Sequence, residues 1–158
     1  MEFKQENLDE IDIQILERLQ ANARTTWTEI AADLGLTGPA IAERTRKLEE
    51  RGIIRGYHAQ LEPERTGCGL LAYIAVQLRH PQARQPFLDR VQTMPEILEC
   101  HHMTGEDDYW LKVRCASTAA LERIISREFQ THEGIKTRTT IVLSSPKETP
   151  NLPLESKT

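Results

Sequence analysis

The sequence predicts an α+β protein with a helical N-terminal domain and a C-terminal domain built on one antiparallel sheet. Apolar residues recur every three or four positions up to about residue 50, whereas beyond residue 70 helical stripes alternate with strand-like segments. The order in this second part is strand, helix, strand, strand, helix, strand, which is the βαββαβ order of a ferredoxin-like fold. We expect domains over 1–60 and 70–145, a linker over 61–69 and a tail over 146–158 that forms an arm or is disordered.

Three short helices are expected in the first domain. The first has a single apolar stripe, which comprises Leu8, Ile11, Ile15 and Leu19, and Asn7 or Asp9 precedes it as a cap. Thr26 and Glu29 form a capping box at the start of the second helix, and Gly35 ends it. Thr37 caps the third helix, and Gly52 follows its end.

The second and third helices, joined by a tight corner, have the outline of a helix-turn-helix. A strand or short ribbon expected over Ile53–Leu61 would add a wing. Residues 1–37 hold 3 basic and 8 acidic side chains, whereas residues 44–58 hold 5 basic and 2 acidic ones. Positive charge is therefore concentrated on the expected recognition helix and wing, although the whole chain has a net charge of −4.

The residues expected at DNA are Thr37, Gly38, Pro39, Ala40, Glu43, Arg44, Arg46, Lys47, Arg51 and Arg55. The first four bring small side chains to the groove, and the basic residues contact phosphates or base edges. A plainer interpretation stays open: the helix is a solvated face of mixed charge, on which Arg44 or Arg51 pairs with glutamate at helical spacing.

The first strand of the second domain, Leu70–Leu78, predicts a partner chain. Its even positions are apolar and can face the helices, but Leu71, Tyr73 and Ala75 would then lie on the uncovered face. Because a single layer of helices leaves that face wet, we expect a second copy to pack there and form a homodimer. The remaining elements expected are a helix with the stripe Phe87, Leu88, Val91 and Met94, strands over Ile97–Met103 and Tyr109–Cys115, a helix with the stripe Leu121, Ile124, Ile125 and Phe129, and a strand over Ile135–Leu143.

Composition and motifs argue against several other classes of protein. The three cysteines are odd in number and lack a CxxC spacing, which does not favour a disulfide scaffold. Cys100 and His102 share one face of a strand and His101 the other, so neither a zinc site nor a cysteine nucleophile is expected, and no cofactor is expected either. With no apolar run long enough for a membrane span and no signal-like start, we expect a cytoplasmic protein. Because no catalytic constellation is found, we also expect that it is not an enzyme.

Several linked runs resemble the Lrp/AsnC (feast/famine) transcription regulators. In the first domain these are Leu8–Asp12, Ala23–Thr26, Glu29–Thr37, Glu43–Glu49 and Gly52–Tyr57, and in the second they are Glu99–Lys112 and Gly134–Leu143. The resemblance covers about residues 8–145. It implies a winged helix-turn-helix reader of double-stranded DNA, joined to a ferredoxin-like effector and oligomerisation domain, in dimers that assemble further, commonly into octamers.

The resemblance also implies a site for a small amino acid near the hairpin between the second and third strands of the sheet. The residues carried over are Met103, Thr104, Gly105, Asp107, Asp108, Thr137 and Thr139. Such a turn can offer backbone N–H groups to a carboxylate, and an aspartate can accept from an ammonium group. Equally, Gly105 can serve only the turn and Asp108 only its cap.

This sequence departs from the family pattern at the hairpin, where Asp107 stands in place of a common aromatic residue and completes an acidic run over Glu106–Asp108. We expect this run to repel anionic ligands, so that any effector has a neutral or cationic side chain. The function predicted is a DNA-binding transcription regulator that responds to an amino acid. The alternative is an amino-acid-sensing module that acts on a protein partner and does not bind DNA.

Overall fold

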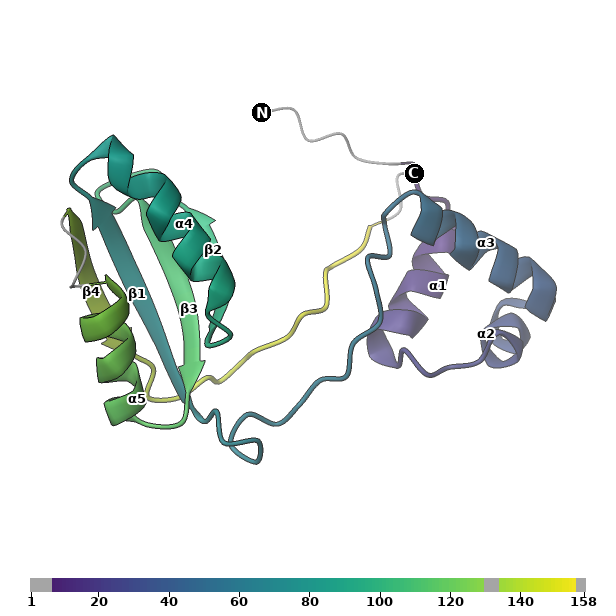
Figure 1. Ribbon diagram of the computed structural model, residues 1–158. Helices are drawn as coiled ribbons and strands as arrows, with labels where there is room; N and C mark the ends of the chain where they lie inside the picture. The colour runs from purple at the N-terminus through teal and green to yellow at the C-terminus, as the bar shows by residue number, and fades with distance from the viewer. Residues whose placement is uncertain (1–6, 130–133, 156–158) are drawn as a thin grey trace. The chain divides into compact units, whose positions relative to one another are not determined.

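The computed structural model describes residues 7–129 and 134–155, and these residues form two compact units (Figure 1). The helical unit contains the described chain up to Gln60 together with the described tail from Glu148, and the sheet unit runs from Leu61 to Lys147. Each unit has its own buried apolar core. Three helices followed by an antiparallel sheet with helices confirm the predicted α+β class.

The helical unit comprises α1 (Glu10–Ala21), α2 (Trp27–Leu34) and α3 (Gly38–Glu50). Of the two residues expected to cap α1, Asp9 is the cap: its Oδ1 accepts a hydrogen bond from the Asp12 N–H at 2.8 Å. The apolar stripes of the three helices meet in a core whose fully buried members are Ile15, Ile30, Ile41 and Leu48. All four residues of the apolar stripe predicted for the first helix belong to this core or pack against it.

The expected wing is not formed, and that part of the prediction is wrong for this chain. The backbone over Ile53–Leu61 contains no strand. Instead, the N–H groups of Ile53 and Ile54 both donate to the Leu48 carbonyl, at 2.9 and 3.2 Å, and their side chains pack against the helical core. A ribbon requires a second strand beside it, and the described part of this chain supplies none to this segment.

The tail contacts the first helix. The Leu152 N–H donates to Gln20 Oε1 at 2.6 Å, and Gln20 Nε2 donates to the Leu152 carbonyl at 3.2 Å. The side chain of Leu154 packs against the helical core. The described tail is thus an arm that packs on the helical unit.

The sheet unit contains four strands in the order β2-β3-β1-β4, all antiparallel, with helices α4 and α5 covering one face (Figure 1). Its elements are β1 (Leu70–Leu78), the short 3₁₀ helix η1 (Pro81–Ala83), α4 (Arg84–Thr93), β2 (Ile97–His102), β3 (Tyr109–Cys115), α5 (Thr118–Arg123), the π-helical segment η2 (Ile124–Phe129) and β4 (Ile135–Ile141). The predicted bounds hold for β1 and β3, whereas β2 and β4 end slightly earlier than predicted. The last helix was expected to continue as one regular stripe, but it widens into the π-helical segment.

The two faces of the sheet differ only in part as the alternation of β1 predicts, because Leu71 and Ala75, expected to be exposed on the uncovered face, are buried. Ala72, Ile74 and Val76 face the helices and are fully buried. On the other face Tyr73 is 37% exposed and Trp110, on β3, is 42% exposed. No helix in the described residues is long and apolar enough to cross a membrane.

Candidate DNA-binding surface and effector site

The corner between α2 and α3 is fixed by local hydrogen bonds. Thr26 Oγ1 accepts from the Glu29 N–H at 3.3 Å, and Glu29 Oε2 accepts from the Thr26 N–H at 2.7 Å. These bonds from Thr26 lower the pKa of the Glu29 carboxyl. Gly35 ends α2 in the left-handed conformation, with φ of +66°, and Thr37 Oγ1 then accepts from the Ala40 N–H at 3.4 Å to begin α3. Only three residues thus separate the two helices, as in a helix-turn-helix.

The beginning of α3 carries small side chains. Thr37 and Pro39 are exposed, and Gly38 and Ala40 are partly so. A Cβ atom placed on Gly38 would come no closer than 3.8 Å to Thr28 Oγ1, which is an ordinary contact. Packing within the chain therefore does not require glycine at position 38.

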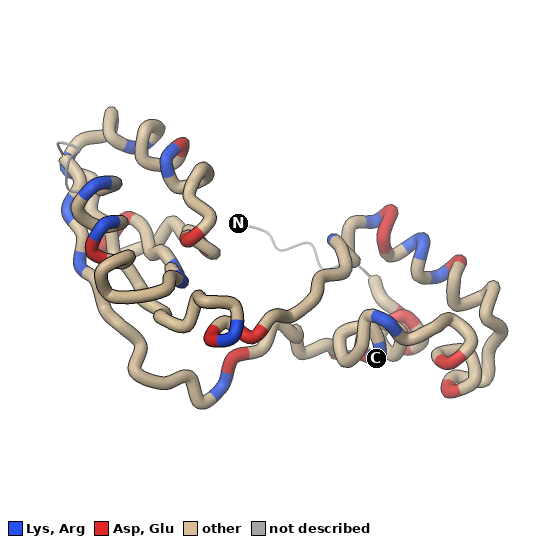
Figure 2. Tube along the Cα trace, turned by 60° about the horizontal axis from the view of Figure 1, so that its bottom comes forward, with Lys and Arg blue, Asp and Glu red and all other residues tan. Residues whose placement is uncertain are grey.

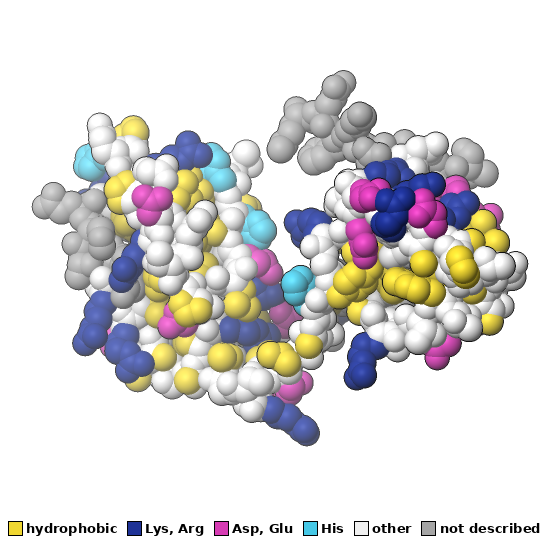
Figure 3. Space-filling model, turned by 45° about the vertical axis from the view of Figure 1, so that its right-hand side comes forward, with side chains coloured by type: hydrophobic (Ala, Val, Ile, Leu, Met, Phe, Trp, Pro, Cys, Tyr) yellow, Lys and Arg dark blue, Asp and Glu magenta, His cyan; other side chains and the backbone are white. Residues whose placement is uncertain are grey.

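Further along α3, cations and carboxylates interleave (Figures 2 and 3). Arg46 pairs with Glu43, at 2.7 Å, and with Glu50. Lys47 Nζ lies 3.5 Å from Glu43. The hydrogen bond between Arg46 and Glu43 raises the pKa of the arginine and lowers that of the glutamate. Because these pairs are exposed, solvent screens them, and a phosphate can replace a glutamate at small cost.

Arg44 has a different environment from its neighbours on α3. Its Nη1 lies 2.8 Å from Asp9 and 2.8 Å from Asp12, and its side chain is only 34% exposed. The hydrogen bond to Asp9 raises the pKa of the guanidinium. Arg44 therefore joins α3 to the start of α1, across helices, and not at the helical spacing that the plainer interpretation considered. That interpretation describes Arg46 better, since its partners lie three and four residues away.

The two remaining basic residues of the predicted set lie after α3. Arg51 Nη2 donates to the Asn7 carbonyl at 3.0 Å. Arg55 is exposed on the extended segment where the wing was expected. Of the cations in the predicted set, Arg46, Lys47, Arg51 and Arg55 are exposed, and Arg44 is partly buried.

The loop between β2 and β3 holds most of the predicted effector residues. Asp108 ties this loop to β1: its Oδ2 accepts from the Leu78 N–H at 2.6 Å, and its own N–H donates to the Val76 carbonyl at 2.9 Å. Met103 closes the loop by donating its N–H to the Asp108 carbonyl at 2.8 Å. Thr104 and Gly105 are exposed between them. The described hydrogen bond of the Asp108 side chain thus goes to the end of β1, and not to the turn that the plainer interpretation had it cap.

Asp107 lies at a small pocket beside this loop. Its Oδ2 is 2.7 Å from Arg138 Nη2 and 3.4 Å from Trp110 Nε1. The pocket has a volume of about 70 Å³ and is lined by Ala75, Gln77, Asp107, Lys136, Thr137 and Arg138. That volume accommodates a few water molecules. An amino acid bound here would therefore extend beyond what this chain alone encloses.

The structure brings together some of the predicted effector residues and separates others. Asp107 and Thr137 line the same pocket, whereas Thr139 lies two residues further along β4, opposite Ile74 of β1. Sequence reasoning missed Lys136 and Arg138, which alternate with the two threonines on the same strand. Strand alternation places these two cations on the opposite face from the threonines, so the threonines carried over from the family did not point to them.

The acidic run over Glu106–Asp108 is not the open negative patch that the sequence suggested. Arg138 pairs with Asp107, and the Leu78 N–H bonds the carboxylate of Asp108. The structure therefore weakens the electrostatic reason for excluding an anionic effector.

The cysteine and histidine residues of β2 are divided between the two faces of the sheet. Cys100 is opposite Leu111, and the ring of His102 stacks on Tyr109 with centroids 4.9 Å apart. His101 pairs instead with Glu99, at 3.1 Å. Burial raises the pKa of the Cys100 thiol, which keeps it protonated and weakly nucleophilic. Among the described residues, no group of three or more potential ligands could hold a metal ion.

Two family models match the chain, one in each unit. The AsnC-type helix-turn-helix domain matches residues 8–49, and the Lrp/AsnC ligand binding domain matches residues 71–152. The first match contains α1 to α3, and the second contains the sheet and its helices.

Curated relatives agree over nearly the whole chain. The HTH-type transcriptional regulator LrpA of Mycobacterium tuberculosis is 36% identical over 140 residues, covering 89% of this chain and 93% of the relative. The Leucine-responsive regulatory protein of Escherichia coli is 32% identical over 154 residues, covering 96% and 94%. These names are those of transcription regulators and not of enzymes, as expected for this chain.

Solved structures share the fold. A transcriptional regulator from Neisseria meningitidis, in complex with L-methionine, superimposes with a TM-score of 0.89 at 36% identity, covering 93% of this chain and 97% of that one. A feast or famine regulatory protein from M. tuberculosis, complexed with L-methionine, gives a TM-score of 0.84 at 34% identity, covering 92% and 98%. The capped helix corner, the βαββαβ sheet and these matches lead to one conclusion: the chain belongs to the Lrp/AsnC family of transcription regulators.

Proposed function

We propose that this protein binds specific sites on double-stranded DNA through α3 and that a small amino acid controls this binding. The observation that carries the proposal is the corner at Gly35, which presents the small residues at the start of α3 next to Arg46 and Lys47. The small residues allow close approach to base edges, and the two cations can exchange their exposed carboxylate partners for phosphates.

Binding to operator and random fragments across a salt series tests this proposal. A DNA reader weakens steeply as salt rises, because each phosphate contact releases counterions. Replacing Arg46 by alanine is expected to weaken operator binding roughly ten- to hundredfold if the side chain reads a base. Arg24→Ala, at an exposed arginine between α1 and α2, is the control and is expected to bind as the unaltered protein does.

One observation favours the second candidate function, an amino-acid sensor that acts on a protein partner without binding DNA. Arg44 and Arg46 are both paired with carboxylates of the same chain. If binding to DNA proves weak and insensitive to salt, this second function replaces the first.

For the effector, we propose a small amino acid with a neutral or cationic side chain, bound at the pocket that Asp107 and Thr137 line. The loop residues Met103, Thr104, Gly105 and Asp108, with Thr139 on β4, would complete its surroundings. Two relatives are described as L-methionine complexes, which supports a neutral side chain. Calorimetry with a panel of amino acids tests this, and a preference for aspartate or glutamate would contradict it.

We further propose that the cytoplasmic protein works as a homodimer, paired through the uncovered sheet face, which assembles into larger oligomers, commonly octamers in the family. Half-exposed Tyr73 and Trp110 on that face, and the small volume of the Asp107 pocket, support a second copy there. Light scattering of Trp110→Glu tests this: a charge on that face is expected to yield monomers. Unchanged mass would place the interface elsewhere.

A further inference from the structure

Two of the three cysteines, Cys68 and Cys115, lie near each other where β1 begins and β3 ends. The two strands are antiparallel with Leu70 opposite Cys115, and Cys68 is two residues before Leu70. Residues placed diagonally in this way across an antiparallel pair have Cα atoms about 7–8 Å apart, and their Cβ atoms are closer. Leu70 and Cys115 both pack in the core under the helices, and continued alternation assigns position 68 to the same side.

The two thiols differ in their access to solvent. Cys68 is exposed, whereas Cys115 is 4% exposed. Cys68 Sγ donates to the Thr66 carbonyl at 3.9 Å, and Cys115 Sγ donates to the Ser117 carbonyl at 3.4 Å. A thiol is a weak donor, so these contacts hold the sulfur atoms only loosely. A dissolved oxidant therefore reaches Cys68 first, and both sulfur atoms can leave their present contacts.

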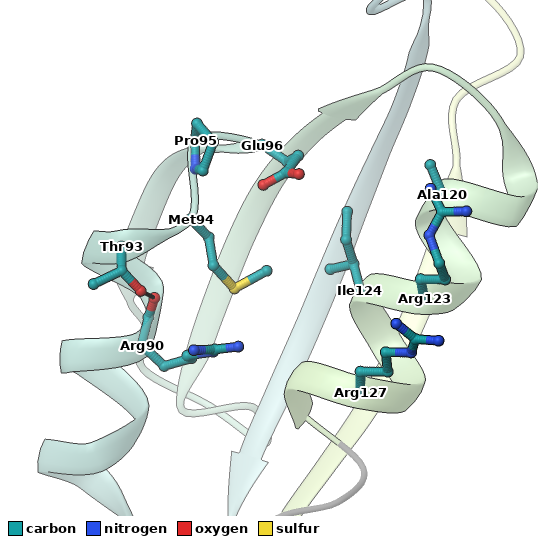
Figure 4. A pocket seen from close by; sticks show the side chains of 9 residues that line it. All are labelled: Arg90, Thr93, Met94, Pro95, Glu96, Ala120, Arg123, Ile124 and Arg127. Carbon is teal, nitrogen blue, oxygen red and sulfur yellow. Dashed lines mark hydrogen bonds between the residues drawn. The ribbon is translucent and has the colours of Figure 1, made fainter.

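The electrostatics around Cys115 agree with this placement. Burial raises the pKa of its thiol, and the Cys68 thiol acts in the same direction, as a like charge does from nearby. Glu96 also raises this pKa, and Arg123 lowers it. Figure 4 shows these two side chains on opposite walls of a pocket of about 300 Å³. Cys115 thus stays protonated at neutral pH and is the less reactive thiol until an electrophilic sulfur comes to it.

Cys100 is too distant to compete for either partner. It lies opposite Leu111, four residues before Cys115 on β3, which is about 13 Å along the strand. A disulfide requires Cα atoms within about 7 Å of each other. Cys68 and Cys115 are therefore the pair that a small backbone shift can join. Gly67, with φ of +78°, precedes Cys68 and gives the linker the freedom to make this shift.

We propose that Cys68 and Cys115 form a reversible intrachain disulfide when hydrogen peroxide oxidises the protein. The Cys68 thiolate attacks one peroxide oxygen, the O–O bond breaks, and a sulfenic acid forms. The hydroxide released takes up the proton that Cys68 gave up. The Cys115 sulfur then attacks the sulfenic sulfur, so that the S–S bond forms and the S–O bond breaks. The oxygen leaves as water with the Cys115 proton, and one peroxide is thus reduced to two waters as two thiols become one disulfide.

The disulfide would fix the end of the linker to the end of β3. A small dithiol reverses it by thiol–disulfide exchange. Disulfides in cytoplasmic proteins are mostly transient and redox-sensing, which fits a bond between one exposed and one buried thiol. This site is independent of the DNA contacts of α3 and of the pocket at Asp107.

Peroxide oxidation of the full chain tests the proposal. Dilute protein is reduced with dithiothreitol, freed of it, treated with equimolar hydrogen peroxide, and quenched with an alkylating agent. Trypsin places each cysteine in a peptide of its own, over 66–79, 91–112 and 115–123. We expect the first and third peptides to be linked, the intact mass to fall by two hydrogen atoms, and dithiothreitol to restore it. A link to 91–112, a link between two chains, or no link would overturn the proposal.

Variants show whether the native fold selects this pair. C68S changes an exposed position and is expected to lose the link completely, whereas C100S, the matched control, should form it as fast as the unaltered protein. C115A should stop at a Cys68 sulfenic acid that dimedone traps. In urea the selectivity should disappear, because the shorter loop between Cys100 and Cys115 closes more easily. Loss of the link in C100S, or the same selectivity in urea, would show that the fold does not pair Cys68 with Cys115.

Discussion

The two compact units are stabilised in different ways. The helical unit buries a cluster of seven apolar residues, and polar contacts cross-link its helices and tail, notably Arg44 with Asp9 and Asp12, and Gln20 with the Leu152 backbone. The sheet unit buries a cluster of twelve, in which Phe87 packs against both Tyr109 and Phe129. Because a small unit buries less apolar surface, individual polar contacts matter more to it. A basic residue in the helical unit, such as Arg44, can therefore stabilise the fold and be less available to contact DNA.

The two tryptophans make this comparison measurable. Trp27 belongs to the helical unit and Trp110 to the sheet unit, and the chain contains no others. Urea unfolding followed by fluorescence in Trp110→Phe therefore reports the helical unit, and the same measurement in Trp27→Phe reports the sheet unit.

The largest effect is expected for Phe87→Ala. Phe87 is 1% exposed at the centre of the sheet unit, and removing such a ring leaves a cavity that costs about 3–5 kcal/mol. The Trp110 signal should show this loss, while the Trp27 signal stays unchanged. If both signals shift together, the units unfold as one and the comparison fails.

Arg44→Ala is expected to have the next largest effect, confined to the helical unit. It leaves Asp12, whose side chain is only 12% exposed, without its cationic partner, at a cost of about 2 kcal/mol. Arg46→Ala, two residues further along the same helix, is the control, since its partners are exposed glutamates. Its Trp27 transition should not move. Equal stability of the two variants would show that the cross-link contributes nothing.

The same contrast shows which features the sequence could predict. The caps at Asp9, Thr26 and Thr37 were predictable because each bond spans three residues. The pairing of Arg44 with Asp9 was not, because it joins residues 35 positions apart and depends on how the helices pack. The wing failed for a related reason: residues with strand character form a strand only beside a partner, and residues 7–129 and 134–155 supply none there.

At the effector site, the sequence placed the hairpin correctly but not its charges. The family resemblance selected Thr137 and the hairpin residue Asp107, which both line the small pocket. Arg138, the ion-pair partner of Asp107, lies 31 residues away on β4, which β1 and β3 separate from β2. The charges of residues 106–108 taken alone therefore suggested that this run repels anionic ligands, whereas in the folded chain Arg138 pairs with Asp107.

A smaller effect is expected at the tail. Leu154→Ala removes a half-buried side chain from the helical core and should cost about 1 kcal/mol in the Trp27 transition. Leu152→Ala is the matched control, because its side chain is 69% exposed and its bonds to Gln20 use the backbone. A loss in both variants, or in neither, would indicate that the arm does not stabilise this unit through Leu154.

The smallest effect is the pH dependence of the contact at Asp9. Burial alone would raise the pKa of this carboxyl, but the Asp12 N–H and the Arg44 guanidinium outweigh it and hold the pKa below 3.8. A lowered pKa stabilises the folded state at pH values above the unfolded pKa, and this contribution disappears as pH falls through the folded pKa. Since the Asp9 side chain is 53% exposed, its ionised contact contributes less than about 1 kcal/mol to the free energy of unfolding.

Asp9→Asn isolates this contribution, since asparagine still caps the helix but carries no charge. The difference in unfolding free energy between the unaltered protein and Asp9→Asn should be present at about pH 5 and should decline as pH falls below 3.8 and through the lowered pKa of the folded state. In the Arg44→Ala background the difference at the higher pH should shrink, because one of the groups that lower the pKa is gone. A difference that does not change with pH would mean that Asp9 stabilises α1 as an uncharged cap alone, and that the Arg44 cross-link acts only through Asp12.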